Sequence, residues 1–276
     1  MSRLIITPSG LTPPTFTWAT KPAATGFVGL AFISDIGVNG SMWTSNGVKW
    51  VISSPVILAI EDAGIVFPSL ATSNAATYSQ TGTTITVTST GHSIPATVHD
   101  GKDVYLISNT GALVTGRYTS FTRVDANTFT CVSGISQAIT GTLTTNTGLV
   151  SFPLITLPAD FLGIRGSIET PCSVSMPNSS VVKTITAKLG GSTYSTNTYT
   201  TGIVSVVLYS GFKNVTAGKQ IAISAVSTLG YGQSASALLV MAEDTTVGKI
   251  VSTNLQLSAA DSYLVLENIS VVFKQG

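Results

Sequence analysis

The chain has two histidines, His92 and His99, and histidine is the side chain best suited to acid–base or metal chemistry near neutral pH. Asp100 and Asp103 lie close by and serines are abundant, so a Ser-His-Asp arrangement can be sketched. However, no Gly-x-Ser-x-Gly elbow stands at a strand-to-helix turn. His92 follows Gly91 and is expected to be an ordinary surface or turn-capping residue. We therefore expect no catalytic residue, and we do not expect an enzyme.

Metal and cofactor sites are not expected either. Two histidines seven residues apart, with Cys131 and Cys172 distant in sequence, do not make a four-ligand zinc site. Calcium would need more oxygen ligands than Asp100 and Asp103 supply. The pair Gly190-Gly191 precedes no helix, so it forms no phosphate cradle. A disulfide between the two cysteines stays open, and two buried free thiols are the interpretation that we favour.

Paired carboxylates are the remaining source of chemistry. Glycan hydrolysis would need two of them roughly 5 to 10 Å apart. The neighbours Glu61-Asp62 and Glu243-Asp244 would point to opposite faces of a strand, and we expect them to be solvated turn residues. Glu267 lies in an apolar strand and is expected to be partly buried. Its expected partner is one of three cations, namely Arg165, Lys249 or Lys274.

The composition bounds the class of protein. Of 276 residues, 43% are hydrophobic and only 9% are charged, against about 25% in ordinary globular domains. A surface of Ser, Thr, Asn and Gly suits a protein that buries much of itself against other chains. The net charge of +1 comes without a cluster of Lys and Arg, so neither nucleic acid nor a membrane is an expected partner. No apolar run reaches the ~18 residues of a membrane helix.

The elements that must position these residues are strands. Residues 1–25 hold several prolines, which disfavour helices and central strands, so we expect an extended N-terminal arm that lies on another chain or on a partner. Residues 26–71 are expected to form a small β meander used for attachment, with Asn-Gly hairpin turns seven residues apart. Trp43 and Trp50 share that spacing. They are either a platform on which a ligand stacks or the core of a very small module, and we favour the core.

Two further β units are expected to follow. Residues 72–147 form a middle β domain, in which Thr-rich segments alternate with period two. Residues 148–276 form a C-terminal jelly-roll sandwich, because β-branched and aromatic runs are separated by short turns. No long segment has an apolar period of 3.6, so the fold class is all-β. Three aromatic residues are expected in loops, where they could stack on sugar rings or pack between chains: Tyr194, Tyr199 and Tyr231.

Seven segments resemble parts of phage fibre proteins: residues 33–50, 86–95, 101–106, 116–118, 126–130, 180–191 and 259–267. The first is similar to a stretch common near the N-termini of tailed-bacteriophage structural proteins. The next four resemble a small β domain repeated in phage fibres, although Ser93-Ile94 stands where a glycine after the histidine is more usual. The last two resemble the C-terminal jelly-roll module of phage fibre proteins.

The resemblance implies a virion structural protein with no cofactor and no catalytic residue. It would be a homotrimeric tail fibre or spike subunit, joined to other virion proteins through the N-terminal arm and module. The jelly roll would face a glycan or protein of the host surface. A capsid (head) fibre or decoration protein is the alternative. Two further hypotheses are a non-viral glycan-binding module and a glycan-degrading spike that depends on Glu169 or Glu267, although no repeat of the β-helix kind is present.

Overall fold

The structure of the protein is a computed structural model. It describes residues 6–7, 10–11, 15–26, 28–36, 41–46, 50–52, 55–61, 64–69, 76–144, 150–163, 165–222, 239–259 and 262–275. Strands make up 64% of the structure, and the described residues contain one short 3₁₀ turn, η1 (Ala24–Gly26), and no α-helix. The all-β expectation is confirmed. Within these ranges, no helix has the length and apolar character needed to cross a membrane.

Most strands belong to one large mixed sheet. Its order is β11-β13-β12-β10-β8-β22-β15-β18-β19-β20, with β7 also paired to β22 and β9 to β13. The strands are β7 (Val56–Glu61), β8 (Ile65–Ser69), β9 (Thr77–Thr88), β10 (Asp103–Leu106), β11 (Ser108–Thr110), β12 (Gly116–Arg123), β13 (Thr128–Leu143), β15 (Ser167–Ser175), β18 (Ser205–Thr216), β19 (Lys219–Ala222), β20 (Leu239–Met241) and β22 (Ser262–Lys274). The sheet therefore links distant parts of the chain.

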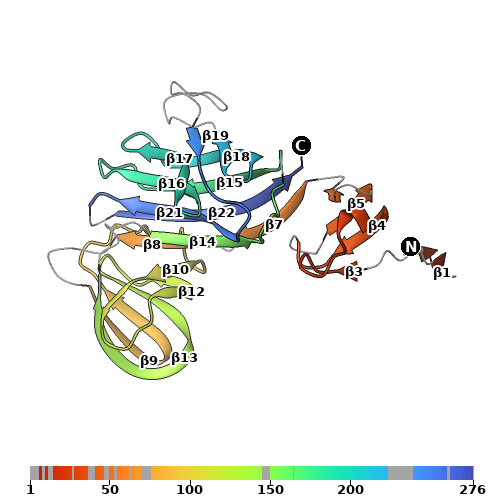
Figure 1. The fold of residues 1–276 in the computed structure, drawn as a ribbon. Helices are drawn as coiled ribbons and strands as arrows, with labels where there is room; N and C mark the ends of the chain where they lie inside the picture. The colour runs from red at the N-terminus through yellow and green to blue at the C-terminus, as the bar shows by residue number, and fades with distance from the viewer. Residues whose placement is uncertain are drawn as a thin grey trace.

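A second, antiparallel sheet packs against one part of the large sheet, and the two layers form a β-sandwich (Figure 1). Its strands, in the order β14-β21-β16-β17, are β14 (Val150–Leu157), β21 (Lys249–Leu257), β16 (Lys183–Leu189) and β17 (Ser192–Tyr199). Burial alternates along β15, so that Ile168, Cys172 and Val174 point into the space between the layers. Leu189 of β16 and Leu255 of β21 meet them there.

Strands β7 and β8 lie beside β22 in the large sheet, although their residues were expected to belong to the N-terminal module. Val66 of β8 pairs with Val265 of β22. Ile65 and Phe67 enter the sandwich core, whereas Val66 enters a separate core formed by the middle unit. A strand that is buried on both faces has a continuous apolar sequence. The sequence of β8 therefore does not indicate which strands it pairs with.

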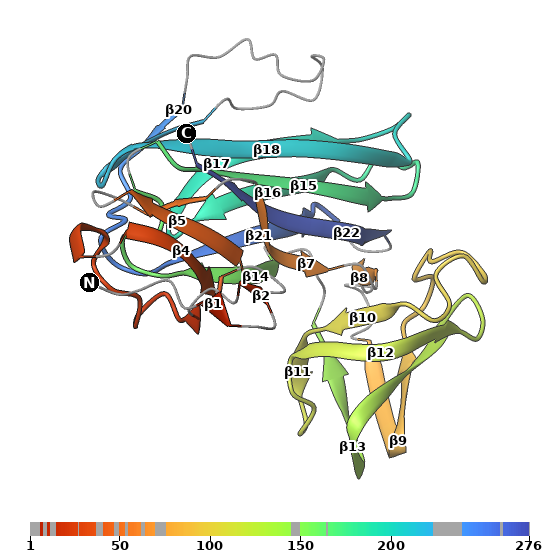
Figure 2. The ribbon, with the colours of Figure 1, turned by 90° about the vertical axis from the view of Figure 1, so that its right-hand side faces the viewer.

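Residues 76–144 form the middle unit, which the chain builds between β8 and β14. Strands β9 and β13 pair along most of their length, and β12 and β10 continue the sheet to β8. The unit has its own core around Phe121 and Phe129. Tyr263 and Val265 of β22 complete that core, so the unit is packed on the sandwich and lies beneath it in Figure 2.

The N-terminal module is a four-stranded sheet of order β3-β4-β5-β6, with β3 (Thr15–Phe16), β4 (Val28–Ile33), β5 (Ser41–Asn46) and β6 (Trp50–Ile52); a separate pair joins β1 (Ile6–Thr7) to β2 (Gly10–Leu11). Strands β4, β5 and β6 pair antiparallel in chain order. Strand β3, from the segment expected to lie on another chain, pairs instead with β4. It does so because Phe16 and Trp18 pack against the core that contains Trp43. The expected Asn39-Gly40 turn lies outside the described residues.

Cys131 and Cys172 are free and buried, which confirms the favoured interpretation. They lie in different cores, one in the middle unit and one in the sandwich. Burial raises the pKa of each thiol to about 12. Both are therefore protonated packing residues, because the thiolate is the reactive form.

Candidate functional site

The two histidines are structural residues. His92 is fully buried and packs edge-on against Phe129, while His99 packs against Tyr263 of the sandwich. The Ile94 N–H donates to His92 Nδ1 at 3.2 Å, so this ring does cap a turn, but in the core and not at the surface. Burial lowers the pKa of both rings. Their neutral form therefore prevails in the folded protein at pH 7.

Glu267 is half-buried and paired with Lys102, and the three cations expected from sequence are not its partner. Ser175 Oγ also donates to its carboxylate. Burial raises the pKa of Glu267, but the ammonium and the hydroxyl outweigh it, so the pKa lies below its usual value. The correct partner was not found because Lys102 comes from the middle unit, which is folded onto β22 in the structure. This ion pair ties the middle unit to the sandwich.

The other candidate carboxylates are also held by neighbours. Asp103 pairs with Arg117 within the middle unit. Glu169, a residue of the glycan-degrading hypothesis, pairs with Lys274 at 2.7 Å on the outside of the large sheet. No group of three or more His, Cys, Asp or Glu side chains suited to a metal ion occurs within the described ranges.

Glu243 was expected to be a solvated turn residue, and this was wrong. Its carboxylate accepts hydrogen bonds from the N–H groups of Gly191 and Ser192 at 3.1 and 2.9 Å, and it pairs with Lys249 at 2.9 Å. Burial raises the pKa of Glu243, but Lys249 and Ser192 bring it below the usual value. The carboxylate therefore fastens the turn between β16 and β17. Asp244 is exposed, as expected.

Tyr194 and Tyr199 are not loop aromatics. Both lie on β17 with their rings in the sandwich core, and Tyr194 is fully buried. The Tyr194 hydroxyl is 3.0 Å from Thr170 Oγ1, and its ring packs edge-on against Phe212. Burial raises the pKa of both tyrosines. The two residues are five positions apart, and both can point inward because the pairing of β17 with β16 shifts register at Tyr194. Neither ring is therefore free to stack on a ligand. Tyr231 lies outside the described residues.

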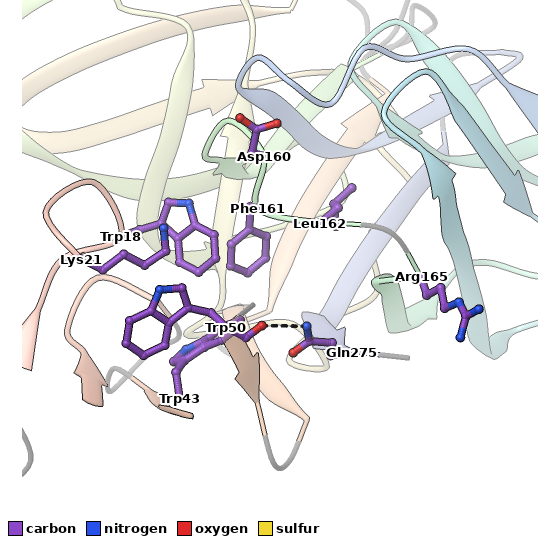
Figure 3. Close-up of a pocket in the computed structure, with 10 residues that line it drawn as sticks. Trp18, Lys21, Trp43, Trp50, Asp160, Phe161, Leu162, Arg165 and Gln275 are labelled. Atoms are coloured by element: carbon purple, nitrogen blue, oxygen red, sulfur yellow. Dashed lines mark hydrogen bonds between the residues drawn. The ribbon is translucent and has the colours of Figure 1, made fainter. Parts of the chain in front are cut away.

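A cavity of about 480 Å³ lies between the N-terminal module and the sandwich (Figure 3). All three tryptophans of the chain, Trp18, Trp43 and Trp50, line it together with Phe161. The centroid of the Trp18 ring lies 5.3 Å from that of Trp43 and 5.0 Å from that of Phe161, in edge-to-face contacts. Phe273 of β22 stacks on Trp43 with centroids 6.0 Å apart. The cavity therefore has an aromatic wall that continues into the core.

A tight turn positions Trp18 and Lys21. The Lys21 N–H donates to the Thr17 carbonyl at 2.9 Å, and the Trp18 N–H donates to Asp35 Oδ1 at 2.6 Å. As a result, Lys21 Nζ lies 4.0 Å from the centroid of the Trp18 ring, a cation–π contact. Burial lowers the pKa of Lys21, while Asp160 and Asp35 oppose this effect.

Trp50 is held by the C-terminal end of the chain. Gln275 Nε2 donates to the Trp50 carbonyl at 2.9 Å, and Gln275 Oε1 accepts from the Ile52 N–H at 2.7 Å. The Trp50 Nε1–H donates to the Pro22 carbonyl at 3.0 Å. The two Gln275 bonds fix the backbone of β6 against the sandwich, and the bond to Pro22 fixes the Trp50 ring within the N-terminal part of the chain.

The far side of the cavity is a loop between β14 and β15. Asp160, Gly163 and Arg165 line the cavity with φ values of 57°, 54° and 78°. The first and last are non-glycine residues in the left-handed region, where such conformations cost free energy and often accompany function. Residues 160–163 form an irregular turn with these φ values.

Trp43 and Trp50 are the two residues of the cavity that the sequence predicted to lie together, and the sequence did not predict that the other lining residues join them. Trp18 stands in a proline-rich segment, and Phe161 and Arg165 stand in a loop without a motif. No local signal joins these positions, since the cavity is assembled from five distant segments. The polar side chains that line it are those of Lys21, Asp160, Arg165 and Gln275.

A second feature is the outer face of the large sheet, which faces away from the sandwich core. Five exposed apolar residues lie on it: Ile57 (47% exposed), Ile60 (52%), Val207 (59%), Tyr209 (53%) and Val240 (57%). Residues that pair across neighbouring strands point to the same face of the sheet. Tyr209 pairs with Pro171 of β15, and Ile60 and Ile57 pair with Ser270 and Val272 of β22. We call these five residues the outer sheet face. An apolar surface of this kind commonly marks an interaction site.

No family model matches the chain, and no curated protein does. Among solved structures, a fructofuranosidase from Schwanniomyces occidentalis complexed with fructose aligns over 90% of this chain and 70% of that chain. The two are 8% identical, and the TM-score is 0.13. A TM-score at this level supports neither a shared fold nor a shared activity.

Proposed function

We propose that this chain is a structural subunit of a bacteriophage virion. It assembles as a homotrimer and serves as a tail fibre or spike that presents its sandwich to the host surface. A head fibre or decoration protein is the alternative placement. The proposal rests on the resemblance of its segments to phage fibre proteins, on the strand order of the sandwich and on the outer sheet face.

The strand order supports the jelly-roll part of the proposal. Eight strands form two four-stranded layers, β8-β22-β15-β18 and β14-β21-β16-β17. In chain order, β8, β14, β15, β16, β17, β18, β21 and β22 switch between the layers as the strands of a jelly roll do. The first of these strands precedes the middle unit. In this reading, residues 76–144 are an insertion into the jelly roll and not a separate domain before it.

The outer sheet face is the observation that carries the proposal. Val207 and Tyr209 are each more than half exposed on β18, toward one end of the strand order of the sheet. Burial of an exposed aliphatic or aromatic side chain stabilises a complex by about 1.5–3 kcal/mol. Only 9% of the chain is charged, so little repulsion opposes the contact of identical copies. Closed symmetry would bury this surface and protect it from open-ended association.

The test is the mass of the purified chain by light scattering, together with a disruptive variant and a matched control. The wild type is expected to be a trimer. Val207→Asp places a charge on the outer sheet face and is expected to give a folded monomer. Val114→Asp is the control, because Val114 is 73% exposed but lies on the middle unit. A monomeric wild type would overturn the proposal, and a V207D trimer would show that the interface lies elsewhere.

A further inference from the structure

The middle unit meets the sandwich at a buried histidine. His99 is 3% exposed, and its ring packs edge-on against that of Tyr263 with the centroids 5.3 Å apart. Tyr263 belongs to β22 and, together with Val265, completes the core of the middle unit, which lies beneath the sandwich in Figure 2. We call this contact the junction. We infer that the junction is a pH-sensitive switch, in which protonation of the His99 ring opens the middle unit from β22. This inference does not depend on the trimer.

The His99 ring is held at the junction as an apolar group. Neither Nδ1 nor Nε2 of His99 has a hydrogen-bond partner in the part of the chain that the structure describes. A protonated imidazole is a cation with two donors, and burial of a cation without hydrogen bonds costs far more free energy than burial of the neutral ring. The closed junction therefore accepts the neutral ring and disfavours the protonated one. An open junction, in which water reaches the ring, accepts both.

The charged groups around His99 do not compensate for its burial. Asp100 and Lys102 lie next to it in the chain, and Glu267 lies on β22. Burial lowers the pKa of His99 most strongly and Lys102 lowers it further, while Glu267 and Asp100 oppose this effect, and the net result is a pKa below the usual value. The Glu267 carboxylate is engaged with Lys102 and Ser175 Oγ, and it makes no hydrogen bond to the ring.

The remaining neighbours of the junction keep their charge where histidine titrates. Strand β8 carries no titratable side chain. Strand β12 contributes Arg117 and Arg123, which stay protonated, and Arg117 pairs with Asp103 of β10. Burial raises the pKa of the Tyr263 phenol, so this group stays neutral. Histidine is the side chain whose ordinary pKa places its change of charge between pH 5 and 8, and His99 therefore provides the pH response of the junction.

The junction is the place where the middle unit can separate from the sandwich. The ladder between β10 and β8 is short, whereas β9 and β13 pair along most of their length within the unit. The loop that carries His99 is bonded to the middle unit, since the Phe121 N–H donates to the Lys102 carbonyl at 2.7 Å. On opening, His99 therefore stays with the middle unit, while Tyr263 stays with the sandwich.

The chain carries a reporter in each core. Cys131 lies in the core that Tyr263 completes, and Cys172 lies in the sandwich core. The full chain is treated with a pyridyl disulfide reagent, and the labelling rate of each cysteine is followed by mass spectrometry. Each rate is divided by that of the urea-unfolded chain at the same pH, which removes the effect of thiol ionisation. The open junction has an ordinary histidine pKa of about 6.5, so the Cys131 rate is expected to rise up to about tenfold between about pH 7.5 and about pH 5.5. The Cys172 rate is expected to stay unchanged.

Three variants separate the pH response from the stability of the junction. His99→Phe keeps an aromatic ring against Tyr263 and is expected to abolish the rise. His92→Asn is the matched control: His92 is buried against Phe129 within the middle unit, asparagine keeps an acceptor for the turn that it caps, and the rise is expected to remain. Glu267→Gln removes the ion pair and is expected to speed Cys131 labelling at both pH values while the rise remains. The ratio of the two rates within each variant cancels a general loss of stability.

The inference is wrong if the wild type shows no rise at Cys131, or if His99→Phe shows the same rise as the wild type. A rise at both cysteines would assign the acid sensitivity to unfolding of the whole chain. Loss of the rise in His92→Asn would assign it to unfolding of the middle unit itself, and either result would reject the switch. A trimer without the rise would refute this inference and leave the proposed function intact, and a monomer that shows the rise would do the opposite.

Discussion

The junction between the N-terminal module and the sandwich depends on Phe273. This ring is 1% exposed, its centroid lies 4.6 Å from that of Phe161, and it stacks on Trp43. Replacement of a buried phenylalanine by alanine costs about 3–5 kcal/mol, through lost burial and the cavity left behind. The total stability of a folded protein is about 5–15 kcal/mol. Phe273→Ala should therefore remove a large share of it.

The assay is urea denaturation followed by tryptophan emission and by far-UV circular dichroism. Phe273→Ala should lower the midpoint strongly and shift the native emission to longer wavelength, because Trp43 loses its stacked neighbour. Phe273→Leu keeps part of the volume and should do both to a smaller extent. Phe121→Ala is the control: Phe121 is equally buried but belongs to the core of the middle unit. It should cost a similar amount and leave the native emission unchanged. A cost below about 1 kcal/mol for Phe273→Ala, with unchanged emission, would refute the packing of the module on the sandwich.

Three further predictions concern the cores. The free energy of unfolding should fall as the pH drops below about 6.5, because burial lowers the folded pKa of both histidines and the unfolded chain then binds more protons than the folded one. His99→Phe should make this pH dependence less steep, and an equal slope in the variant would contradict the prediction. Gly141→Ala should destabilise the protein by about 1–3 kcal/mol, because a Cβ there would lie 2.1 Å from the Thr110 carbonyl oxygen. Gly134→Ala is the control: a Cβ at Gly134 has no atom within 4 Å, so this variant should be near neutral in thermal melts. Iodoacetamide should label neither cysteine in the native protein and both after denaturation, since burial raises both thiol pKa values to about 12; rapid labelling of the folded chain would contradict their burial.

The sequence predicted the features that follow from local pattern. The β-branched runs indicated strands, and the spacing of Trp43 and Trp50 indicated the core of a meander. The pairing partners of the strands could not be predicted from local pattern. The run Ile65-Val-Phe67 is apolar throughout because two units cover its two faces, and nothing local indicates that these units lie on either side of it. Tyr194 was placed in a loop because the polar, Thr-rich sequence around it hides a strand that alternates inward.

The cavity could not be predicted for a different reason. Its residues come from the turn at Trp18, from β5 and β6, from the loop around Phe161 and from Gln275 at the end of the chain. Only the packing of the N-terminal module on the sandwich brings them together. Residues such as Asp160 and Arg165 carry no motif, and their positive φ values are properties of the folded loop. A site that is assembled between units of a fold in this way can be identified only from the structure.

The central claim is that this polypeptide is a repeated part of a phage particle. An antibody raised against the purified chain, applied to particles from the lysate of cells that produce it and imaged by electron microscopy, tests this most directly. The account predicts label on three-fold projections of the tail, or of the head in the alternative placement. Particles without label, together with a scattering mass equal to the single-chain value of 28.4 kDa and not three times that value, would contradict it.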